Sequence, residues 1–300
     1  MTDIITQMVA DRRHLHQHPE EGWCEFQTTH FVVERLKALG FEVLLGSDVI
    51  LPEAVMGRDP AKVEKAMEDA RAAGVPESFL EATGGYTGAL GVWKTGRPGP
   101  VTALRFDIDC LAIEETSDPA HIPNAEGFRS KVPGMSHARG HDGHTAVGLG
   151  VAAWVAAHAE EHMRSLESIK GFGPVRLKAL AARGIVDDVD WFAGAHIGCS
   201  AKLHEVGVSH HGYLATTKFD LDITGVPCAA GSPENGKSAL MCGAALCISL
   251  GSLPGHSQGI TRVQIGKFVS GTGRNIVAEH ASMLFEVRGE STEINDYMAA

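Results

Sequence analysis

The segment from residue 137 to residue 144 constrains the fold of this chain more than any other. It holds three histidines and one aspartate, His137, His141, Asp142 and His144, with two glycines that can bend a loop. Several side chains can converge on one point where the backbone turns, whereas a straight strand sends them to alternate faces. Imidazole and carboxylate are common metal ligands and acid–base groups. The segment therefore predicts a loop with a metal or catalytic role, and a polar surface loop is the alternative.

The residues around this loop predict alternating strands and helices, as in an α/β domain. Asp59 and Pro60 are typical of a helix start, and Gly74 of a helix end. The other expected elements are strands over 86–95 and 101–107, helices over 144–158 and 174–183, and a buried strand over 191–196. The alanine and glycine content of the expected helix over 144–158 indicates that it packs closely against a sheet.

From about residue 207 the pattern changes. Phe219, Leu221 and Ile223 alternate with polar residues, as in a half-buried strand. Asn235 is expected to begin a helix, and two further strands and a helix that begins near Ser291 follow. This order is that of a ferredoxin-like β-α-β-β-α-β module without its last strand. We therefore divide the chain into residues 1–206 and residues 207–300.

Composition excludes several classes of protein. With 300 residues, 44% of them hydrophobic, the chain can bury a substantial core. Its net charge of −11 disfavours nucleic acids and anionic membranes as partners, and no apolar run is long enough to span a bilayer. The six cysteines form no CxxC pair, so reduced thiols and a cytoplasmic location are expected.

The loop resembles the metal loop of the zinc aminoacylase and carboxypeptidase-type amidohydrolase family. The hippurate hydrolase branch of that family carries His-Ala-Cys-Gly-His-Asp-Gly-His, where this chain has His-Ala-Arg-Gly-His-Asp-Gly-His. The same resemblance is carried by residues 13–20, 105–111, 194–198 and 271–277. Within the branch the sequence is most similar to the A subunits of aminobenzoyl-glutamate hydrolases, through residues 59–73, 84–88 and 186–190.

The resemblance implies a fold and an activity. The fold would be α/β, with a mixed-sheet metallopeptidase-like catalytic domain in residues 1–206. An inserted ferredoxin-like lid domain, C-terminally truncated, would occupy residues 207–300. The activity would be metal-dependent hydrolysis of the amide bond of N-acyl or N-aroyl amino acids, with aminobenzoyl-glutamate as one candidate. One or two zinc or manganese ions would be bound, and the lid would pair the chain into a homodimer or with a related subunit.

Roles follow residue by residue from the matching motifs. His141 and His196 would be metal ligands, with His137, His144 or Asp142 completing the set. Asp109 and Asp142 would support catalysis, and Arg274 and Asn275 would bind an anionic substrate.

The sequence also departs from the family pattern. Arg139 replaces the cysteine ligand, and an arginine has no lone pair to give a metal. The expected Glu-Glu pair is missing near 166–174, where Glu167 stands alone, and Ala229 replaces a lid histidine. The chain ends inside the expected lid. A catalytically dead, truncated homologue is therefore the alternative, either a non-catalytic partner subunit or a chain without activity.

Two further groups of polar residues have structural interpretations. His14, His16 and His18 alternate like a metal-binding stripe, but their place in the opening motif favours packing or a position near the substrate. Glu114 and Glu115 follow the strand over 101–107 and are expected in a solvated turn.

Overall fold

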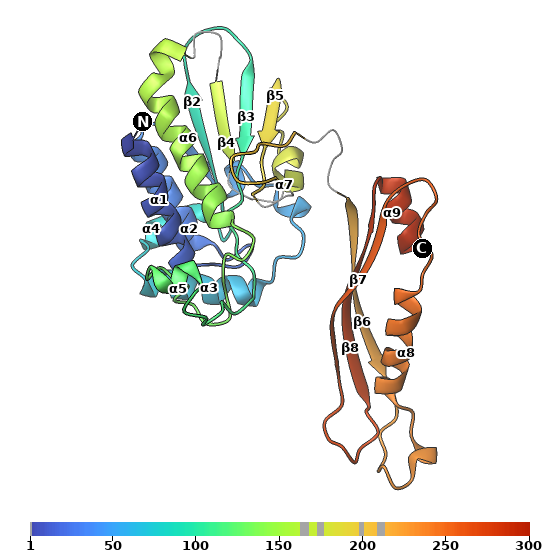
Figure 1. Cartoon of the computed structure of the whole chain (residues 1–300). Helices are drawn as coiled ribbons and strands as arrows, with labels where there is room; N and C mark the ends of the chain where they lie inside the picture. The colour runs from blue at the N-terminus through green and yellow to red at the C-terminus, as the bar shows by residue number, and fades with distance from the viewer. Residues whose placement is uncertain (1, 163–167, 173–176, 198–200, 209–213) are drawn as a thin grey trace. The chain divides into compact units, whose positions relative to one another are not determined.

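The computed structural model describes residues 2–162, 168–172, 177–197, 201–208 and 214–300 (Figure 1). They form two compact units, Met1–Leu203 and His204–Ala300.

The first unit is built on a five-stranded mixed sheet. Its strands are β1 (Glu42–Leu45), β2 (Ala89–Lys94), β3 (Val101–Arg105), β4 (Ser168–Phe172) and β5 (Trp191–Gly194). The order in the sheet is β1-β2-β4-β3-β5, in which β3 runs parallel to β4 and to β5 while the other pairs are antiparallel. Because β4 lies between β2 and β3, the two strands that flank the turn at 96–100 do not pair with each other.

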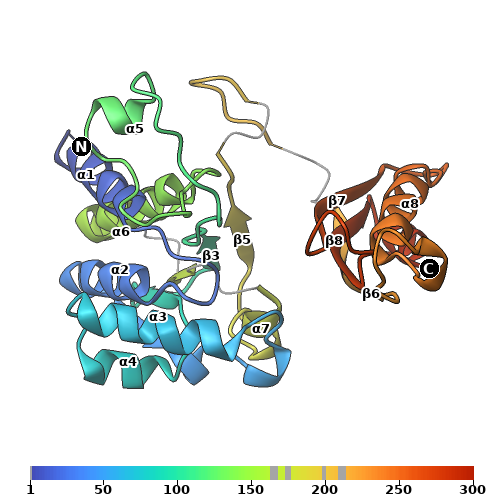
Figure 2. The same ribbon diagram turned by 90° about the horizontal axis from the view of Figure 1, so that it is seen from below.

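The described residues of the first unit also form seven α-helices, most of which lie to one side of β5 in Figure 2. They are α1 (Thr2–Gln17), α2 (Phe26–Ala38), α3 (Pro60–Ala72), α4 (Glu77–Thr83), α5 (Ile122–Ala125), α6 (His141–His162) and α7 (Leu177–Ala182). Helix α3 begins and ends as the sequence predicts. The Asp59 carboxylate accepts a hydrogen bond from the Ala61 amide at 3.0 Å, and Gly74 follows the helix with φ of +93°.

The cap of α3 gives a first testable prediction. Asp59→Ala leaves amide groups of the first turn without their carboxylate partner, so we expect the free energy of unfolding to fall by about 1 kcal/mol. Urea titration followed by circular dichroism measures this change. Glu64→Ala, at an exposed position in the same helix, is the control and should change stability by less than about 0.5 kcal/mol.

The small residues of α6 allow close packing, against the residue that follows β3 and also against helix α1. A Cβ atom at Gly148 would lie 2.7 Å from the ring of Phe106, and one at Gly150 would collide with Met8 of α1. Figure 1 shows α1 and α6 side by side. On its other side α6 contributes Leu149 and Val155 to a core that it shares with α2. The glycines thus fit α6 tightly against a neighbouring helix as well as against the sheet region.

The burial expected for residues 191–196 is wrong. Trp191 is 68% exposed and Phe192 44% exposed. The physical reason is the position of β5, which is the last strand of the described sheet and pairs only with β3 there.

The second unit has the element order expected from the sequence: β6 (Ala215–Thr224), α8 (Ala239–Gly251), β7 (Thr261–Ser270), β8 (His280–Gly289) and α9 (Thr292–Ala299). Strand β8 lies between β6 and β7 and is antiparallel to both. Half-buried and exposed residues alternate along β6, as predicted. The start of α8 is a correction, because Ser238 rather than Asn235 caps it by accepting a hydrogen bond from the Met241 amide.

Two further findings concern the described residues of both units. None of their helices is long and apolar enough to cross a membrane. The described cysteines Cys24, Cys110, Cys228, Cys242 and Cys247 are all free thiols. No disulfide therefore links the parts of the chain that the structure describes.

Candidate metal centre

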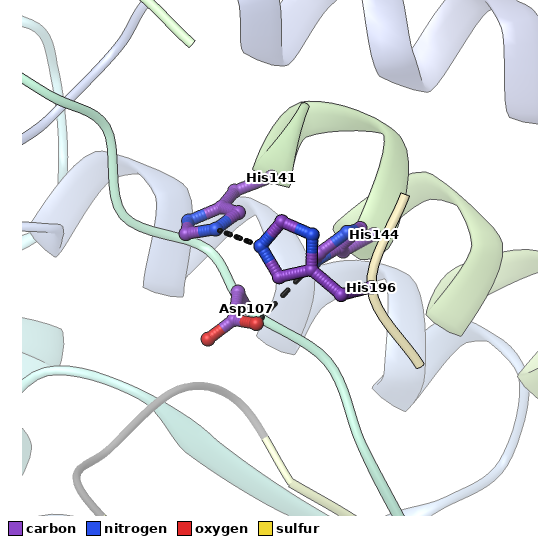
Figure 3. A group of neighbouring side chains, drawn as sticks. All are labelled: Asp107, His141, His144 and His196. Atoms are coloured by element: carbon purple, nitrogen blue, oxygen red, sulfur yellow. Dashed lines mark hydrogen bonds and ion pairs between the residues drawn. The ribbon is translucent and has the colours of Figure 1, made fainter. Parts of the chain in front are cut away.

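Three elements of the first unit bring four ligand-type side chains together (Figure 3). Asp107 lies two residues after β3, and His196 lies two residues after β5. His141 and His144 stand in the first turn of α6. Since β3 and β5 are parallel neighbours, their carboxyl ends meet at one edge of the sheet, where the N-terminus of α6 also lies.

The distances within this cluster suit a bound ion. One ligand atom from each residue can be chosen so that all four lie within 4.8 Å of one another. The Nε2 atoms of His141 and His196 are 3.3 Å apart. Two nitrogens bound to one tetrahedral zinc at about 2.0–2.1 Å are separated by about 3.3–3.4 Å. The two imidazoles are therefore already at ligand spacing.

Hydrogen bonds fix which nitrogen of each ring is free. Nδ1 of His141 is 2.9 Å from the carbonyl oxygen of Asp109 and 3.0 Å from its carboxylate, so Nδ1 is the donor. Nδ1 of His196 donates to the carbonyl oxygen of Ile197 at 2.7 Å. In the neutral rings both Nε2 atoms then carry lone pairs. These lone pairs face each other at 3.3 Å, an arrangement that a shared positive charge stabilises.

Asp107 and His144 form the other half of the cluster. Nε2 of His144 accepts a hydrogen bond from the Ile197 amide at 2.9 Å, and its Nδ1 lies 3.3 Å from Oδ2 of Asp107. Burial acts to raise the pKa of Asp107, but hydrogen bonding from His144 and the charge of Arg105 lower it below its usual value. Asp107 is thus a buried anion that can neutralise part of a dication's charge.

The pKa of His141 is raised above its usual value. Burial alone would lower it, but the hydrogen bond and negative charge of Asp109 outweigh burial. The same contact that orients the ring therefore also makes it a stronger base. A carboxylate behind a ligating imidazole has this double effect in metal sites.

The donor set fits a divalent metal. Three imidazoles and one carboxylate are nitrogen and oxygen donors of the kind that bind zinc and related ions. Arg139, which replaces the family's cysteine, is exposed and is not among the four clustered residues. The cluster therefore provides Nε2 of His141, Nε2 of His196 and the Asp107 carboxylate without using that position, while both ring nitrogens of His144 are engaged by Asp107 and Ile197.

The contact between Asp109 and His141 gives a second prediction. Asp109→Asn removes the charge that orients and strengthens His141, so we expect metal affinity to fall about 10-fold to 100-fold. Competition with a chromophoric chelator measures the affinity. Asp220→Asn, at an exposed position on β6, makes the same chemical change in the other unit and should leave the affinity unchanged.

The carboxylate of Asp142 is directed to α1 instead of to the cluster. It is 1% exposed and lies 2.8 Å from Nε of Arg12 and 2.9 Å from Nδ1 of His16. Burial would raise its pKa, but His16 and Arg12 hold it below the usual value. Its catalytic role stays a prediction, while its contacts tie the start of α6 to α1.

His137 also stands apart from the four clustered residues. Its ring is buried, 6.4 Å from that of His16, and burial lowers its pKa to about 4. Neither ring nitrogen has a hydrogen-bond partner among the described residues. The prediction that His137 is a ligand stays a prediction.

The solvated turn expected for Glu115 is wrong. Its side chain is 5% exposed, and Oε1 lies 2.8 Å from Nε2 of both His16 and His121. Oε2 accepts a hydrogen bond from the Ser130 amide at 2.7 Å. His16 is accordingly buried between two carboxylates, those of Glu115 and Asp142, in agreement with the packing role expected for it.

The remaining predicted residues are not part of the described first unit. Arg274 and Asn275 are exposed in the second unit. Glu167, the nearest match to the Glu-Glu pair, lies outside the described residues.

Asp107 is the member of the cluster that the sequence did not lead us to assign. A signal was present, because Asp107 and Asp109 are two residues apart and the match over 105–111 included both. In extended backbone, residues two apart point to the same side. In the structure both carboxylates reach the N-terminus of α6, Asp109 at His141 and Asp107 at His144.

Comparison of the sequence with known proteins identifies the family of this chain. Residues 103–296 match the profile of peptidase family M20/M25/M40. The chain is 40% identical to a p-aminobenzoyl-glutamate hydrolase homolog of Haemophilus influenzae, over 98% of this chain and 71% of that protein. It is 41% identical to indole-3-acetyl-aspartic acid hydrolase of Enterobacter agglomerans, over 98% of this chain and 69% of that protein.

A solved structure leads to the same family. The aminobenzoyl-glutamate utilization protein of Klebsiella pneumoniae superposes with a TM-score of 0.71 at 36% identity, covering 99% of this chain and 70% of that one. The mixed α/β fold and the family resemblance expected from the sequence are thereby confirmed. The cluster of Asp107, His141, His144 and His196 and these matches together show that the chain belongs to peptidase family M20/M25/M40, whose members matched here are metal-dependent amidohydrolases.

Proposed function

We propose that this chain hydrolyses the amide bond of N-acyl or N-aroyl amino acids with the help of a divalent metal. Aminobenzoyl-glutamate is the first substrate to test, because two matched proteins are named for it. Indole-3-acetyl-aspartic acid, named in a third match, is also an acyl group joined to an acidic amino acid. An N-acylated acidic amino acid is therefore the proposed substrate class.

One observation carries the proposal: the Nε2 atoms of His141 and His196 lie 3.3 Å apart, the spacing of two ligands on one ion, while an oxygen atom holds Nδ1 of each ring. Asp107 adds an anionic donor, and His144 lies within reach of the same point. Zinc or manganese is the proposed metal.

The chain's own residues hold this centre in place. A divalent ion bound there would supply Lewis-acid chemistry, activating a water molecule and polarising the amide carbonyl of the substrate. Asp109 fixes the ring of His141, while the backbone of Ile197 holds two rings, accepting from His196 and donating to His144. The hydroxyl of Thr145 donates to the carbonyl oxygen of Asp107 at 2.8 Å, which ties α6 to the end of β3.

The other parts of the proposal concern residues away from the cluster. We propose that the first unit is the catalytic domain and that the second is an inserted ferredoxin-like lid. Arg274 and Asn275 would bind the substrate carboxylate, since a guanidinium matches a carboxylate in two-point geometry. Pairing through the lid, with a second copy or a related subunit, and a cytoplasmic location complete the proposal.

A non-catalytic partner subunit is the second candidate, favoured by Arg139 at the position of the family's cysteine. An assay separates the two. Purified chain is incubated with aminobenzoyl-glutamate and with hippurate, after chelation and again after addition of zinc or manganese. Turnover that appears with metal and disappears with chelator supports the hydrolase. Absence of turnover in every condition, including with Arg139→Cys, supports the non-catalytic role.

A further inference from the structure

The turn that leads into α6 carries an arginine beside the candidate metal centre. Arg139 stands two residues before His141, and consecutive Cα atoms are 3.80 Å apart, so the Cα atoms of the two residues are at most about 7.6 Å apart. The Gly140 amide donates to the carbonyl oxygen of His137 at 3.0 Å and closes the turn. Gly140 has φ of +77°, in the left-handed region that favours glycine. The chain therefore reverses direction between Arg139 and the first histidine of α6.

The same turn also lies close to the segment that carries His196. A Cβ atom at Gly140 would lie 3.8 Å from Cβ of Ile197, and one at Gly143 would lie 2.8 Å from Cδ1 of Ile197. Ile197 follows His196 and accepts a hydrogen bond from its ring. The immediate neighbour of Arg139 in the sequence is thus adjacent to the backbone that holds the second imidazole of the centre.

The guanidinium of Arg139 is available to bind an anion. Its side chain is exposed, and it forms no hydrogen bond or ion pair with any residue that the structure describes. By contrast, Arg105 pairs with Asp107, and Arg12 pairs with Asp142 in the first turn of α6. Arg139 is therefore an arginine of this region whose charge is not used within the described fold.

The acidic side chains of the centre do not neutralise Arg139. Asp107 contacts His144 and Arg105, and Asp109 contacts His141. Because the guanidinium is exposed, water and salt screen its repulsion of a cation bound to the histidines. A positive group thus stands beside the centre with its donors directed to no carboxylate of the described residues.

We propose that Arg139 binds the side-chain carboxylate of the substrate and thereby makes this chain select N-acyl derivatives of acidic amino acids. The inference rests on the function proposed above, in which Arg274 and Asn275 bind one substrate carboxylate. An N-acylated glutamate or aspartate has a second carboxylate, only a few bonds from the amide that would be cleaved at the centre. A guanidinium is a planar fork of N–H donors and can hold a carboxylate through two parallel hydrogen bonds.

Two ligands that differ only in this carboxylate test the proposal. They are N-phenylsulfonyl-glutamate and N-phenylsulfonyl-glutamine, in which a sulfonamide replaces the amide, so that neither requires turnover to be measured. Isothermal titration calorimetry gives their affinities for the zinc-saturated wild-type chain and for Arg139→Gln. We expect Arg139→Gln to weaken binding of the glutamate ligand about 10-fold to 100-fold, as for the loss of a charge-assisted hydrogen bond, and to leave the glutamine ligand unchanged.

Two further variants serve as controls. Arg183→Gln removes another exposed arginine of the first unit and should change neither affinity. Arg139→Lys keeps the positive charge but loses the planar fork, so it should restore part of the affinity for the glutamate ligand. Circular dichroism verifies that each variant is folded.

The proposal is overturned if folded Arg139→Gln binds the glutamate ligand as tightly as the wild type. It is also overturned if both ligands are weakened equally, or if the wild type does not distinguish them. These results are separate from hydrolysis. Binding that depends on Arg139, in a chain without turnover of aminobenzoyl-glutamate, supports this inference and contradicts the hydrolase. Turnover with the same KM in wild type and Arg139→Gln supports the hydrolase and overturns this inference.

Discussion

Replacing His196 by alanine should lower kcat/KM for aminobenzoyl-glutamate by about 100-fold to 1000-fold. The reason is that His196 supplies one of the two Nε2 lone pairs that face each other at 3.3 Å. Loss of metal polarisation removes several kcal/mol of transition-state stabilisation, and each 1.36 kcal/mol is a factor of ten in rate. The rate is measured by release of aminobenzoate or glutamate at saturating metal.

The control for this experiment is His280→Ala, which removes an exposed imidazole in the second unit. It should leave kcat/KM unchanged. Because His196 is only half-buried, its removal should affect stability little compared with activity. A His196→Ala chain that is folded and as active as the wild type would show that the cluster does not serve catalysis.

Replacing His16 by asparagine should cost about 3–5 kcal/mol of unfolding free energy, which is typical when one partner of a buried ion pair is removed. Nδ1 and Nε2 of His16 lie 2.9 Å and 2.8 Å from Asp142 and Glu115, whose side chains are 1% and 5% exposed. Without the imidazole, these two buried carboxylates lose a shared positive partner. Urea unfolding of His16→Asn and of the control His280→Asn measures the difference.

The pH dependence of this effect follows from the pKa shifts. Burial would lower the pKa of His16, but Asp142 and Glu115 raise it above 6.5, so its contribution is lost as pH rises through that raised value. The pKa values of Glu115 and Asp142 are lowered from 4.5 and 3.8. The contribution of these two carboxylates to the free energy of unfolding is therefore lost as pH falls through those lowered values. The stability difference between wild type and His16→Asn should therefore be greatest between about pH 4.5 and 6.5. A difference that grows steadily above pH 7 would contradict this explanation.

Elements fixed by local chemistry could be predicted from the sequence. Asp59, Pro60 and Gly74 define α3 through contacts within a few residues. The same holds for the alternation of half-buried and exposed residues along β6. It also holds for the segment 137–144, where the close spacing of three histidines and one aspartate indicates a site. In each case the determining partners are near in the sequence.

Features that depend on partners distant in the sequence could not be predicted in the same way. The burial of Glu115 depends on His16, 99 residues away. The exposure of Trp191 depends on the position of β5 at the edge of the described sheet, and the order of strands places β4 between β2 and β3. Asp107 enters the cluster because β3 and β5 are parallel neighbours, a pairing that no local pattern in either strand specifies.

The central claim is that His141 and His196, together with Asp107, hold a divalent metal. The most direct test is the difference in bound zinc between the wild-type chain and His141→Ala/His196→Ala, measured by elemental analysis after dialysis against a fixed free Zn²⁺ concentration. The difference excludes zinc ions bound elsewhere on the chain. We predict that the variant binds at least one zinc ion fewer per chain than the wild type. Equal zinc content in two folded chains would contradict the claim.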